Sequence, residues 1–151
     1  MIKHKGGCYC GNVRFETEYD PLLVMNCHCR TCKKLGGAVL STSATFNIPE
    51  VNITGVYKTF QYSGASGNNL YSDFCNNCGC KIFTRVDLIE GIMYVHLGTF
   101  DDHDVFKPKI DIWDEYKCSW IINDGCIQEN FPDNGTLERI QQLLDNLDQR
   151  S

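Results

Sequence analysis

The chain has 151 residues, of which 42% are hydrophobic, 11% aromatic and 22% charged, and this length and composition favour one globular domain over two. A formal net charge of −5 and an isoelectric point near 5.3 argue against a surface that binds nucleic acid. No apolar run approaches the length of about 18 residues needed to span a bilayer. The first ten residues contain no apolar core, so we expect no secretory signal and a cytoplasmic protein.

Short strands separated by turns are the predicted elements along most of the chain. Residues 13–16 alternate, with Val13 and Phe15 expected to face inward. Runs rich in β-branched and aromatic residues follow at three places: 56–62, 80–86 and 92–100. The sequence therefore predicts a mostly β domain of antiparallel strands, and small domains of this type often need a metal ion for stability.

The one helix that we predict lies at the end of the chain. A stripe of apolar residues recurs there at helical spacing: Leu137, Ile140, Leu143, Leu144 and Leu147. The sequence Asn-Gly-Thr at 134–136 can cap the start of this helix. We expect the helix to pack on the body of the domain, and a helix that binds a partner is the alternative.

Ten cysteines are the most unusual feature of the composition. Most of them lie in three tight clusters: Cys8 and Cys10; Cys27, Cys29 and Cys32; and Cys75, Cys78 and Cys80. Because cytosolic thiols are kept reduced, clusters of this kind indicate metal thiolates rather than disulfides. Cys118 and Cys126 stand apart, and we interpret them as ordinary buried or half-buried thiols.

Two cysteine pairs are expected to form one structural zinc site. Cys75 and Cys78 enclose two residues, which lets both sulfurs reach one ion, and the glycine that follows lets backbone amides turn toward the thiolates. Cys8 and Cys10 form a tighter pair that is also followed by glycine. Four thiolates complete a tetrahedron, so this site should be chemically quiet. Redox or unligated cysteines are the alternative, but a thioredoxin-type dithiol requires a βαβ context that the sequence does not show.

Three cysteines nearer the N-terminus are expected to form a second, open zinc site. Cys27, Cys29 and Cys32 supply three thiolates from one short loop, which leaves the fourth position for water or a substrate, as in catalytic zinc sites. A substrate thiol bound there would be deprotonated at neutral pH. His28 and Cys80 are rivals for the fourth position, although His28 should point away from an ion held by its two neighbours. A second closed structural zinc is the remaining alternative.

Basic residues among and just after these cysteines suggest the kind of substrate. They are Arg30, Lys33 and Lys34. A local cationic patch on an otherwise acidic protein suits a small anionic thiol that carries carboxylates. The alternative is a solvated charged surface with no role in binding.

Three other residues are assigned to structure. Trp113 and Trp120 could line a substrate site, but aromatic residues at strand spacing are more often part of a core. His96 lies within the last predicted strand, and we interpret it as a hydrogen-bonded strand residue rather than an acid or base.

The three cysteine motifs, in this order, resemble those of the glutathione-dependent formaldehyde-activating enzyme family, also called the centromere protein V family. The matching segments are residues 7–15 (GCYCGNVRF), 27–34 (CHCRTCKK) and 74–79 (FCNNCG), with further similarity at 98–102, 112–113 and 117–120. The resemblance covers residues 5–132 as a zinc-binding domain and leaves residues 133–151 as a helical tail. Asp111 departs from the family pattern, because members often have histidine there.

The resemblance implies a β-tent fold, similar to that of the small zinc-bearing chaperones of Rab GTPases, and two zinc ions per chain. The structural zinc would lie on the residues matching Cys8, Cys10, Cys75 and Cys78. The catalytic zinc would lie on those matching Cys27, Cys29 and Cys32. The activity attached to the family is the condensation of formaldehyde with glutathione to S-(hydroxymethyl)glutathione, which is classed as a carbon–sulfur lyase reaction.

Our hypothesis from the sequence is therefore a cytoplasmic two-zinc enzyme of this type. The basic residues Arg30, Lys33 and Lys34 would attract glutathione, and His28 would act from behind the zinc ligands. A related lyase that acts on another small electrophile is one alternative. A non-catalytic zinc module that binds a protein partner is another, whereas a nucleic-acid-binding zinc ribbon is disfavoured by the net charge.

Overall fold

Two β-sheets and one α-helix make up the part of the chain that the computed structural model describes, which is residues 1–64, 67–102, 104–122 and 125–133. The strands are β1 (His4–Gly7), β2 (Arg14–Thr17), β3 (Leu23–Cys27), β4 (Ser41–Asn47), β5 (Asn52–Thr54), β6 (Tyr57–Ser63), β7 (Asn69–Cys75), β8 (Lys81–Val86), β9 (Ile92–His96), β10 (Ile110–Ile112) and β11 (Glu129–Asn130). The helix is α1 (Arg30–Gly36), and 3₁₀ turns lie at Ile48–Glu50, Leu97–Thr99 and Asp114–Tyr116. The predicted terminal helix falls outside the described residues.

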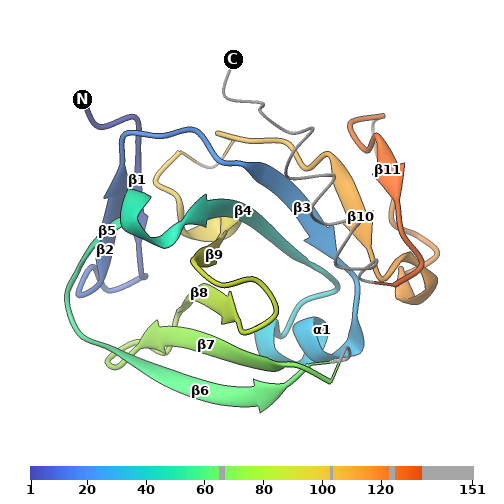
Figure 1. Cartoon of the computed structure of the whole chain (residues 1–151), viewed down its shortest axis with the longest axis horizontal. Coiled ribbons are helices and arrows are strands. Elements are labelled where there is room, and N and C mark those ends of the chain that lie inside the picture. The colour runs from blue at the N-terminus through green and yellow to red at the C-terminus, as the bar shows by residue number, and fades with distance from the viewer. Residues whose placement is uncertain (65–66, 103, 123–124, 134–151) are drawn as a thin grey trace.

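The larger sheet has eight strands in the order β11-β10-β3-β4-β9-β8-β7-β6, and the smaller has three in the order β1-β2-β5. Neighbouring strands are antiparallel, except that β10 pairs in parallel with both β3 and β11. Figure 1 shows the larger sheet curving, so that β6 and β7 lie across from β3 and β10, with α1 between these two ends. The mostly antiparallel β fold that the sequence predicts is confirmed.

The hydrophobic core lies between the smaller sheet and one face of the larger sheet. The register places four buried residues side by side across β3, β4, β9 and β8: Val24, Ala44, Val95 and Phe83. From β2, Phe15 packs edge-on against Phe83, with ring centroids 5.7 Å apart. Burial of an aromatic side chain of this size contributes about 1.5–3 kcal/mol. Val13 and Phe15 both face inward, as predicted from the alternation of this strand.

The opposite face of the larger sheet carries hydroxyl groups over β4, β9, β8 and β7. The register aligns a second row of residues on β4, β9, β8 and β7, and on the first three of these strands each residue is next to a member of the core row. The second row consists of Thr45, Tyr94, Thr84 and Ser72. Successive side chains of a strand point to opposite faces, so these hydroxyl-bearing residues face away from the core. These hydroxyl groups are largely buried, and the same face becomes apolar at β3 and β10, where Leu23 packs with Ile110.

The observed elements differ from the predicted ones in a few places. The predicted strands at 56–62 and 80–86 are confirmed as β6 and β8, but the run at 92–100 is a strand only as far as His96. The sequence pattern does not predict α1, whose seven residues include no buried side chain. Trp120 is 67% exposed, so its assignment to the core is wrong. No helix of the described residues is long and apolar enough to cross a membrane.

Candidate metal centres

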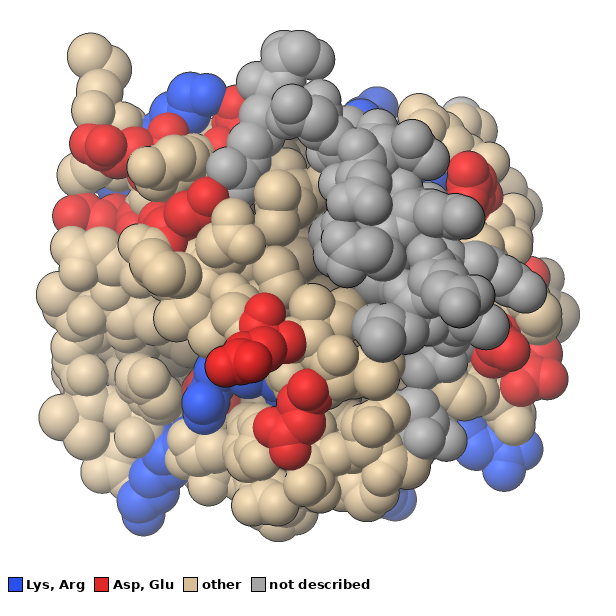
Figure 2. Space-filling view, viewed as in Figure 1, with Lys and Arg blue, Asp and Glu red and all other residues tan. Residues whose placement is uncertain are grey.

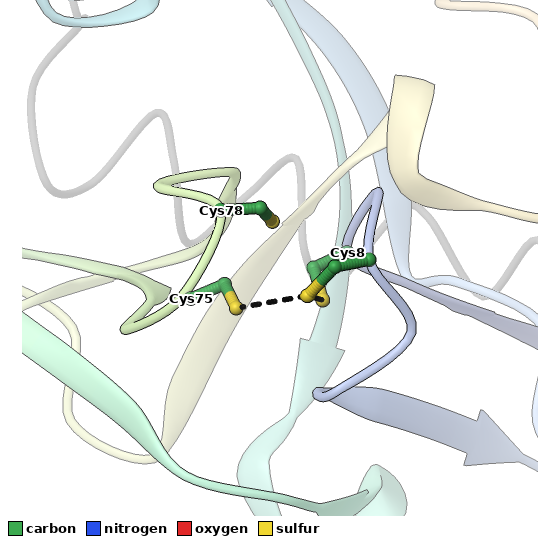
Figure 3. A group of neighbouring side chains, drawn as sticks. Cys8, Cys75 and Cys78 are labelled. Carbon is green, nitrogen blue, oxygen red and sulfur yellow. Dashed lines mark hydrogen bonds between the residues drawn. The ribbon is translucent and has the colours of Figure 1, made fainter.

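Four cysteines from two turns lie together beside the core. Cys8 and Cys10 lie between β1 and β2, whereas Cys75 ends β7 and Cys78 lies in the turn before β8. Their four sulfur atoms all lie within 4.8 Å of one another. Figure 3 shows the side chains of Cys8, Cys75 and Cys78 pointing toward one another from the two turns. The structure thus brings together all four residues that the sequence assigns to a structural site.

Both turns depend on a glycine in the left-handed region of backbone conformation. Gly11 has a φ of 82° and Gly79 a φ of 74°. The Gly11 N–H donates to the Cys8 carbonyl at 3.1 Å, and the Gly79 N–H donates to the Cys75 carbonyl at 3.0 Å. A residue with a side chain would be strained at these angles, so glycine is what lets each turn fold back on its cysteine.

The sulfur separations of this group fit a tetrahedral metal thiolate. Cys10 Sγ is 3.6 Å from Cys8 Sγ and 3.7 Å from Cys75 Sγ. Zinc–sulfur bonds of about 2.3 Å place tetrahedral ligands about 3.8 Å apart. The Val13 N–H donates to Cys8 Sγ at 3.2 Å, and the Asn77 N–H donates to Cys75 Sγ at 3.4 Å. None of the ten cysteines is in a disulfide, so these residues fit a closed four-thiolate site.

A second group of cysteines lies at the start of α1. Cys27 ends β3, Cys29 caps the N-terminus of α1, and Cys32 lies in its first turn. Their three sulfur atoms lie within 4.8 Å of one another, and no fourth His, Cys, Asp or Glu of the described residues joins them. The sequence predicts these three ligands from a loop, but a strand end, a helix cap and a helical turn supply them. We call this group the cysteine triad.

Hydrogen bonds within the cysteine triad favour a thiolate at its centre. The thiols of Cys27 and Cys32 donate to Cys29 Sγ and lower the pKa of Cys29 to about 3. The same hydrogen bonding, together with burial, raises the pKa of Cys27. A metal cation shared by the three sulfurs would replace the shared protons, because thiolates are the form that binds metals. Three soft thiolates are a donor set that suits zinc, with one tetrahedral position left open.

His28 and Cys80, the predicted rivals for that fourth position, do not join the triad. His28 is fully buried, and its Nε2 lies 3.2 Å from Oδ1 of Asp111. Cys80 lies beside the four-cysteine group instead, where burial raises its pKa and the charges of Cys78 and Cys8 add to that rise. The structure therefore separates both residues from the open position.

The three basic residues of this region have different surroundings. Arg30 lies over the ring of Tyr116, with its guanidinium carbon 5.2 Å from the ring centroid. Lys33 donates to the backbone carbonyl of Tyr116 and to Cys118 Sγ, the latter at 3.6 Å. Lys34 is exposed on α1. Two of the three thus hold the turn before Cys118 against α1, and this explains why that thiol is half-buried, as predicted.

Two further residues, Tyr62 of β6 and Lys81 of β8, lie within electrostatic range of the triad. Burial raises the pKa of Tyr62, and the charges of all three triad cysteines add to the rise. Burial lowers the pKa of Lys81, and the same three charges oppose that effect. Sequence reasoning missed both residues, because no motif marks them and only the curvature of the sheet brings β6 close to β3.

His96 is part of a hydrogen-bond chain on the polar face of the larger sheet. Its Nε2 is 2.9 Å from Thr84 Oγ1, and its Nδ1 is 3.2 Å from Ser41 Oγ, which lies opposite Cys27 in the register. Burial and the nearby charge of Lys81 lower the pKa of His96 to about 3, so the ring is neutral at neutral pH. The interpretation of His96 as a hydrogen-bonded strand residue is confirmed.

A third group of possible metal ligands, formed by His28, Asp111 and Asp114, already contains a cation. Lys117 Nζ lies 2.9 Å from Asp111 Oδ2 and 3.9 Å from Asp114 Oδ1. Asn26 donates to Asp111 Oδ1 at 3.0 Å. Burial alone would raise the pKa of Asp111, but the hydrogen bonds from Lys117 and Asn26 and the nearby ring of His28 outweigh it and hold the pKa below its ordinary value. Asp111 and Lys117 therefore form a largely buried ion pair, and the hydrogen bond from Asn26 ties β10 to β3.

Replacing Lys117 by methionine should destabilise the protein, because it removes the cation from a fully buried carboxylate. The expected loss is about 3–5 kcal/mol in the free energy of unfolding, measured by urea denaturation at pH 7. The pKa of Asp111 is lowered by folding, so its contribution is complete above the unfolded value of about 3.9 and is lost as the pH falls further. The difference between the two proteins should therefore shrink below about pH 4. Lys58→Met, at an exposed position, is the control and should change stability by less than about 0.5 kcal/mol.

Comparisons with known proteins agree with this architecture. A crystal structure of a Rhodobacter sphaeroides protein matches with a TM-score of 0.51 at 22% sequence identity, covering 65% of this chain and 88% of that one. At this identity the match shows a shared fold. A sequence model named "Glutathione-dependent formaldehyde-activating enzyme" matches residues 3–116, which include both cysteine groups. The chain belongs to the glutathione-dependent formaldehyde-activating enzyme family.

Proposed function

We propose that this protein is a zinc-dependent carbon–sulfur lyase that condenses formaldehyde with glutathione to S-(hydroxymethyl)glutathione. The observation that carries the proposal is the difference between its two cysteine groups. One group has four sulfurs and can enclose a metal completely, whereas the cysteine triad has three and leaves a position open. Closed thiolate sites are typical of structural zinc and open ones of catalytic zinc. Two zinc ions per chain follow from this division.

The residues around the triad have distinct roles in this proposal. Cys27, Cys29 and Cys32 would hold the zinc ion, which would keep a bound substrate thiol deprotonated at neutral pH. The positive charges of Arg30, Lys33 and Lys34, all on α1, would attract the carboxylates of glutathione, although Arg30 and Lys33 also contact the turn at Tyr116. His28, buried behind the triad against Asp111, fixes the segment between its two neighbouring ligands.

The surface and the thiol chemistry agree with a small-molecule substrate and a cytoplasmic protein. In Figure 2, acidic and basic side chains occur in small, separate groups over the described part of the face in view. The described part of the face in view therefore carries no extended basic patch of the kind that binds nucleic acid. Thiolate clusters require reduced cysteines, which the cytosol maintains.

Zinc stoichiometry combined with a glutathione titration tests the proposal. We expect two zinc ions per purified chain, of which a chelator removes one much faster than the other, and glutathione should slow the loss of that faster ion. The rate at which formaldehyde is consumed in the presence of glutathione should then be proportional to the enzyme concentration. Cys126→Ser, which alters a thiol outside both groups, is the matched control and should behave like the unaltered protein.

Two results would point to the rival functions. Two equally inert zinc ions, with no effect of glutathione, would favour a non-catalytic module that binds a protein partner. A response to glutathione without consumption of formaldehyde would favour a lyase that acts on another electrophile.

A further inference from the structure

Cys27 and Ser41 are neighbours on adjacent strands, where β3 ends and β4 begins. They are partners in the antiparallel register of the two strands. Directly opposed residues of such a pair project to the same face, with Cβ atoms about 4.5–5.5 Å apart. The preceding pair, Asn26 and Thr42, projects to the other face, where the Thr42 hydroxyl donates to Asn26 Oδ1 at 2.6 Å. The Ser41 side chain therefore lies next to that of Cys27, a member of the cysteine triad.

His96 joins Ser41 to a second hydroxyl deeper in the sheet. Its Nδ1 is 3.2 Å from Ser41 Oγ, and its Nε2 is 2.9 Å from Thr84 Oγ1. The ring is neutral at neutral pH, and a neutral imidazole has one N–H donor and one acceptor nitrogen. One of the two hydroxyls must therefore donate to the ring, and the other must accept from it.

The burial of the two hydroxyls decides which of them donates. Thr84 is 7% exposed, and among the described residues the ring of His96 is the one hydrogen-bond partner of its hydroxyl. If Thr84 accepted from the ring, its own proton would be buried without an acceptor, which is unfavourable. Ser41 is only half-buried, so its proton can reach water or a ligand. Thr84 therefore donates to Nε2, and the Nδ1–H group donates to Ser41 Oγ.

This arrangement leaves the proton of the Ser41 hydroxyl available. The oxygen already accepts from His96, so the proton is directed away from the ring. Within the part of the chain that the structure describes, no hydrogen bond joins Ser41 to a sulfur of the triad. Ser41 is thus a hydrogen-bond donor of fixed position beside Cys27, and a small group bound at the open position of the triad can bring the acceptor.

We propose that the Ser41 hydroxyl donates a hydrogen bond to the oxygen of the one-carbon electrophile, and that His96 is the positioning residue that orients Ser41. This inference rests on the proposed function. The sulfur of the substrate thiolate gives an electron pair to the carbonyl carbon and forms the C–S bond, while the π pair of the C=O bond moves to the oxygen. Ser41 stabilises the resulting alkoxide and keeps its own proton. Water protonates the alkoxide, and the proton that the thiol released on binding neutralises the hydroxide, so the reaction is balanced.

The tautomer of His96 is tested by nitrogen-15 magnetic resonance, and this test requires no substrate. Ring nitrogens with and without a proton differ widely in chemical shift, and their long-range couplings to the ring protons identify each nitrogen. The signals that disappear in His96→Asn belong to His96. We expect Nδ1 to carry the proton at neutral pH. If Nε2 carries it, Ser41 must donate to the ring, and the proposal is overturned.

Turnover by Ser41→Ala tests the hydrogen bond to the alkoxide. We expect kcat to fall about 10-fold to 100-fold, which is the range for the loss of one hydrogen bond to a charged group. The zinc content and the KM for glutathione should stay within about twofold, since Ser41 holds neither the metal nor the peptide. Ser43→Ala is the matched control, because Ser43 lies on the same face of β4 two residues farther from the triad, and it should keep its kcat. An unchanged kcat in Ser41→Ala would overturn the proposal.

Variants of His96 separate positioning from a merely structural role. The amide nitrogen of the new side chain in His96→Asn can occupy the place of Nδ1, whereas that in His96→Gln can occupy the place of Nε2. We therefore expect His96→Asn to retain more of the kcat than His96→Gln. In the Ser41→Ala background the two changes should give equal kcat values, because no hydroxyl remains to be oriented. The same difference in both backgrounds would show that His96 does not act through Ser41.

A binding measurement distinguishes failure of this inference from failure of the proposed function. S-Acetylglutathione has an oxygen on the carbon that is bonded to sulfur, and S-ethylglutathione does not. In calorimetry with the zinc-loaded protein, Ser41→Ala should bind the acetyl compound at least about threefold more weakly and the ethyl compound equally well. Equal weakening of both would overturn the proposal even if the enzyme is active, and no binding of either by the unaltered protein would overturn both proposals. The selective loss without formaldehyde consumption would count against the proposed function and leave the role of Ser41 standing.

Discussion

Cys78→Ser is expected to remove one zinc ion and to lower the temperature at which the domain unfolds. The four-cysteine group joins the turn after β1 to the end of β7, and Cys10 and Cys75 are 65 positions apart. A cross-link that closes a loop of this length contributes about 4 kcal/mol by restricting the unfolded chain. Metal binding at structural thiolate sites contributes about 10–16 kcal/mol in small zinc domains. Either figure is comparable with the total stability of about 5–15 kcal/mol of a typical domain.

Calorimetry and metal analysis of the purified variant provide the measurement. We expect the midpoint of thermal unfolding to fall by about 10 °C or more, since each kcal/mol shifts a domain of this size by about 2–4 °C. Cys80→Ser is the matched control, because Cys80 lies beside the group without belonging to it. Cys80→Ser should keep its zinc and its unfolding temperature. A Cys78→Ser protein that retains its zinc and unfolds normally would show that the four cysteines do not form a structural site.

The sequence predicts the two cysteine groups well, because the spacing of cysteines in a short segment nearly determines which sulfurs can meet. The pair at Cys75 and Cys78 needs only a tight turn, and the following glycine supplies it. That Cys8 and Cys10 meet this pair does not follow from spacing alone. It follows from the core, where Phe15 of β2 packs on Phe83 of β8 and so brings the two turns together.

The helix α1 could not be predicted from periodicity or composition. Its seven residues are too few to show a helical repeat, and none of its side chains is buried. Its start is capped by the sulfur of Cys29 rather than by Ser, Thr, Asp or Asn, which are the usual signals. Its end is set by Gly37, whose φ of 60° completes the cap. The same cysteine thus starts the helix and belongs to the triad, so a metal bound there would also stabilise the helix.

Sequence reasoning could not identify the residues of other strands whose pKa values respond to the charges of the triad. Lys81 and Tyr62 lie in strands that the sequence does predict, but their direction depends on details of the sheet. The register between β7 and β8 shifts at Asp73, just before the pair of Phe74 with Lys81, and β6 and β3 are separated by four other strands in the order of the larger sheet. Nearness in sequence can also mislead. Arg30 and Lys33 are next to the triad cysteines in the sequence, but in the structure both contact Tyr116.

Cys32→Ser is expected to stay folded and to lose one zinc ion together with all measurable lyase activity. Three members of the four-cysteine group, Cys8, Cys75 and Cys78, lie in or against the main hydrophobic core, whereas none of the triad cysteines belongs to that core. Removing the Cys32 thiol leaves the backbone N–H that donates to Cys29 Sγ, so the cap of α1 persists. Two thiolates hold zinc far more weakly than three, and we expect a decrease in kcat of at least about 1,000-fold, similar to the loss of an essential catalytic group.

Three quantities are measured on one preparation of each variant. They are the number of zinc ions per chain, the midpoint of thermal unfolding and the rate of formaldehyde consumption. Cys118→Ser is the matched control, since Cys118 is a half-buried thiol that contacts Lys33 from outside the triad. Cys118→Ser should keep two zinc ions and most of its activity. If Cys32→Ser unfolds as Cys78→Ser does, the triad holds a structural metal and its open position has no catalytic role. If it keeps full activity after losing a zinc ion, the reaction takes place elsewhere on the protein.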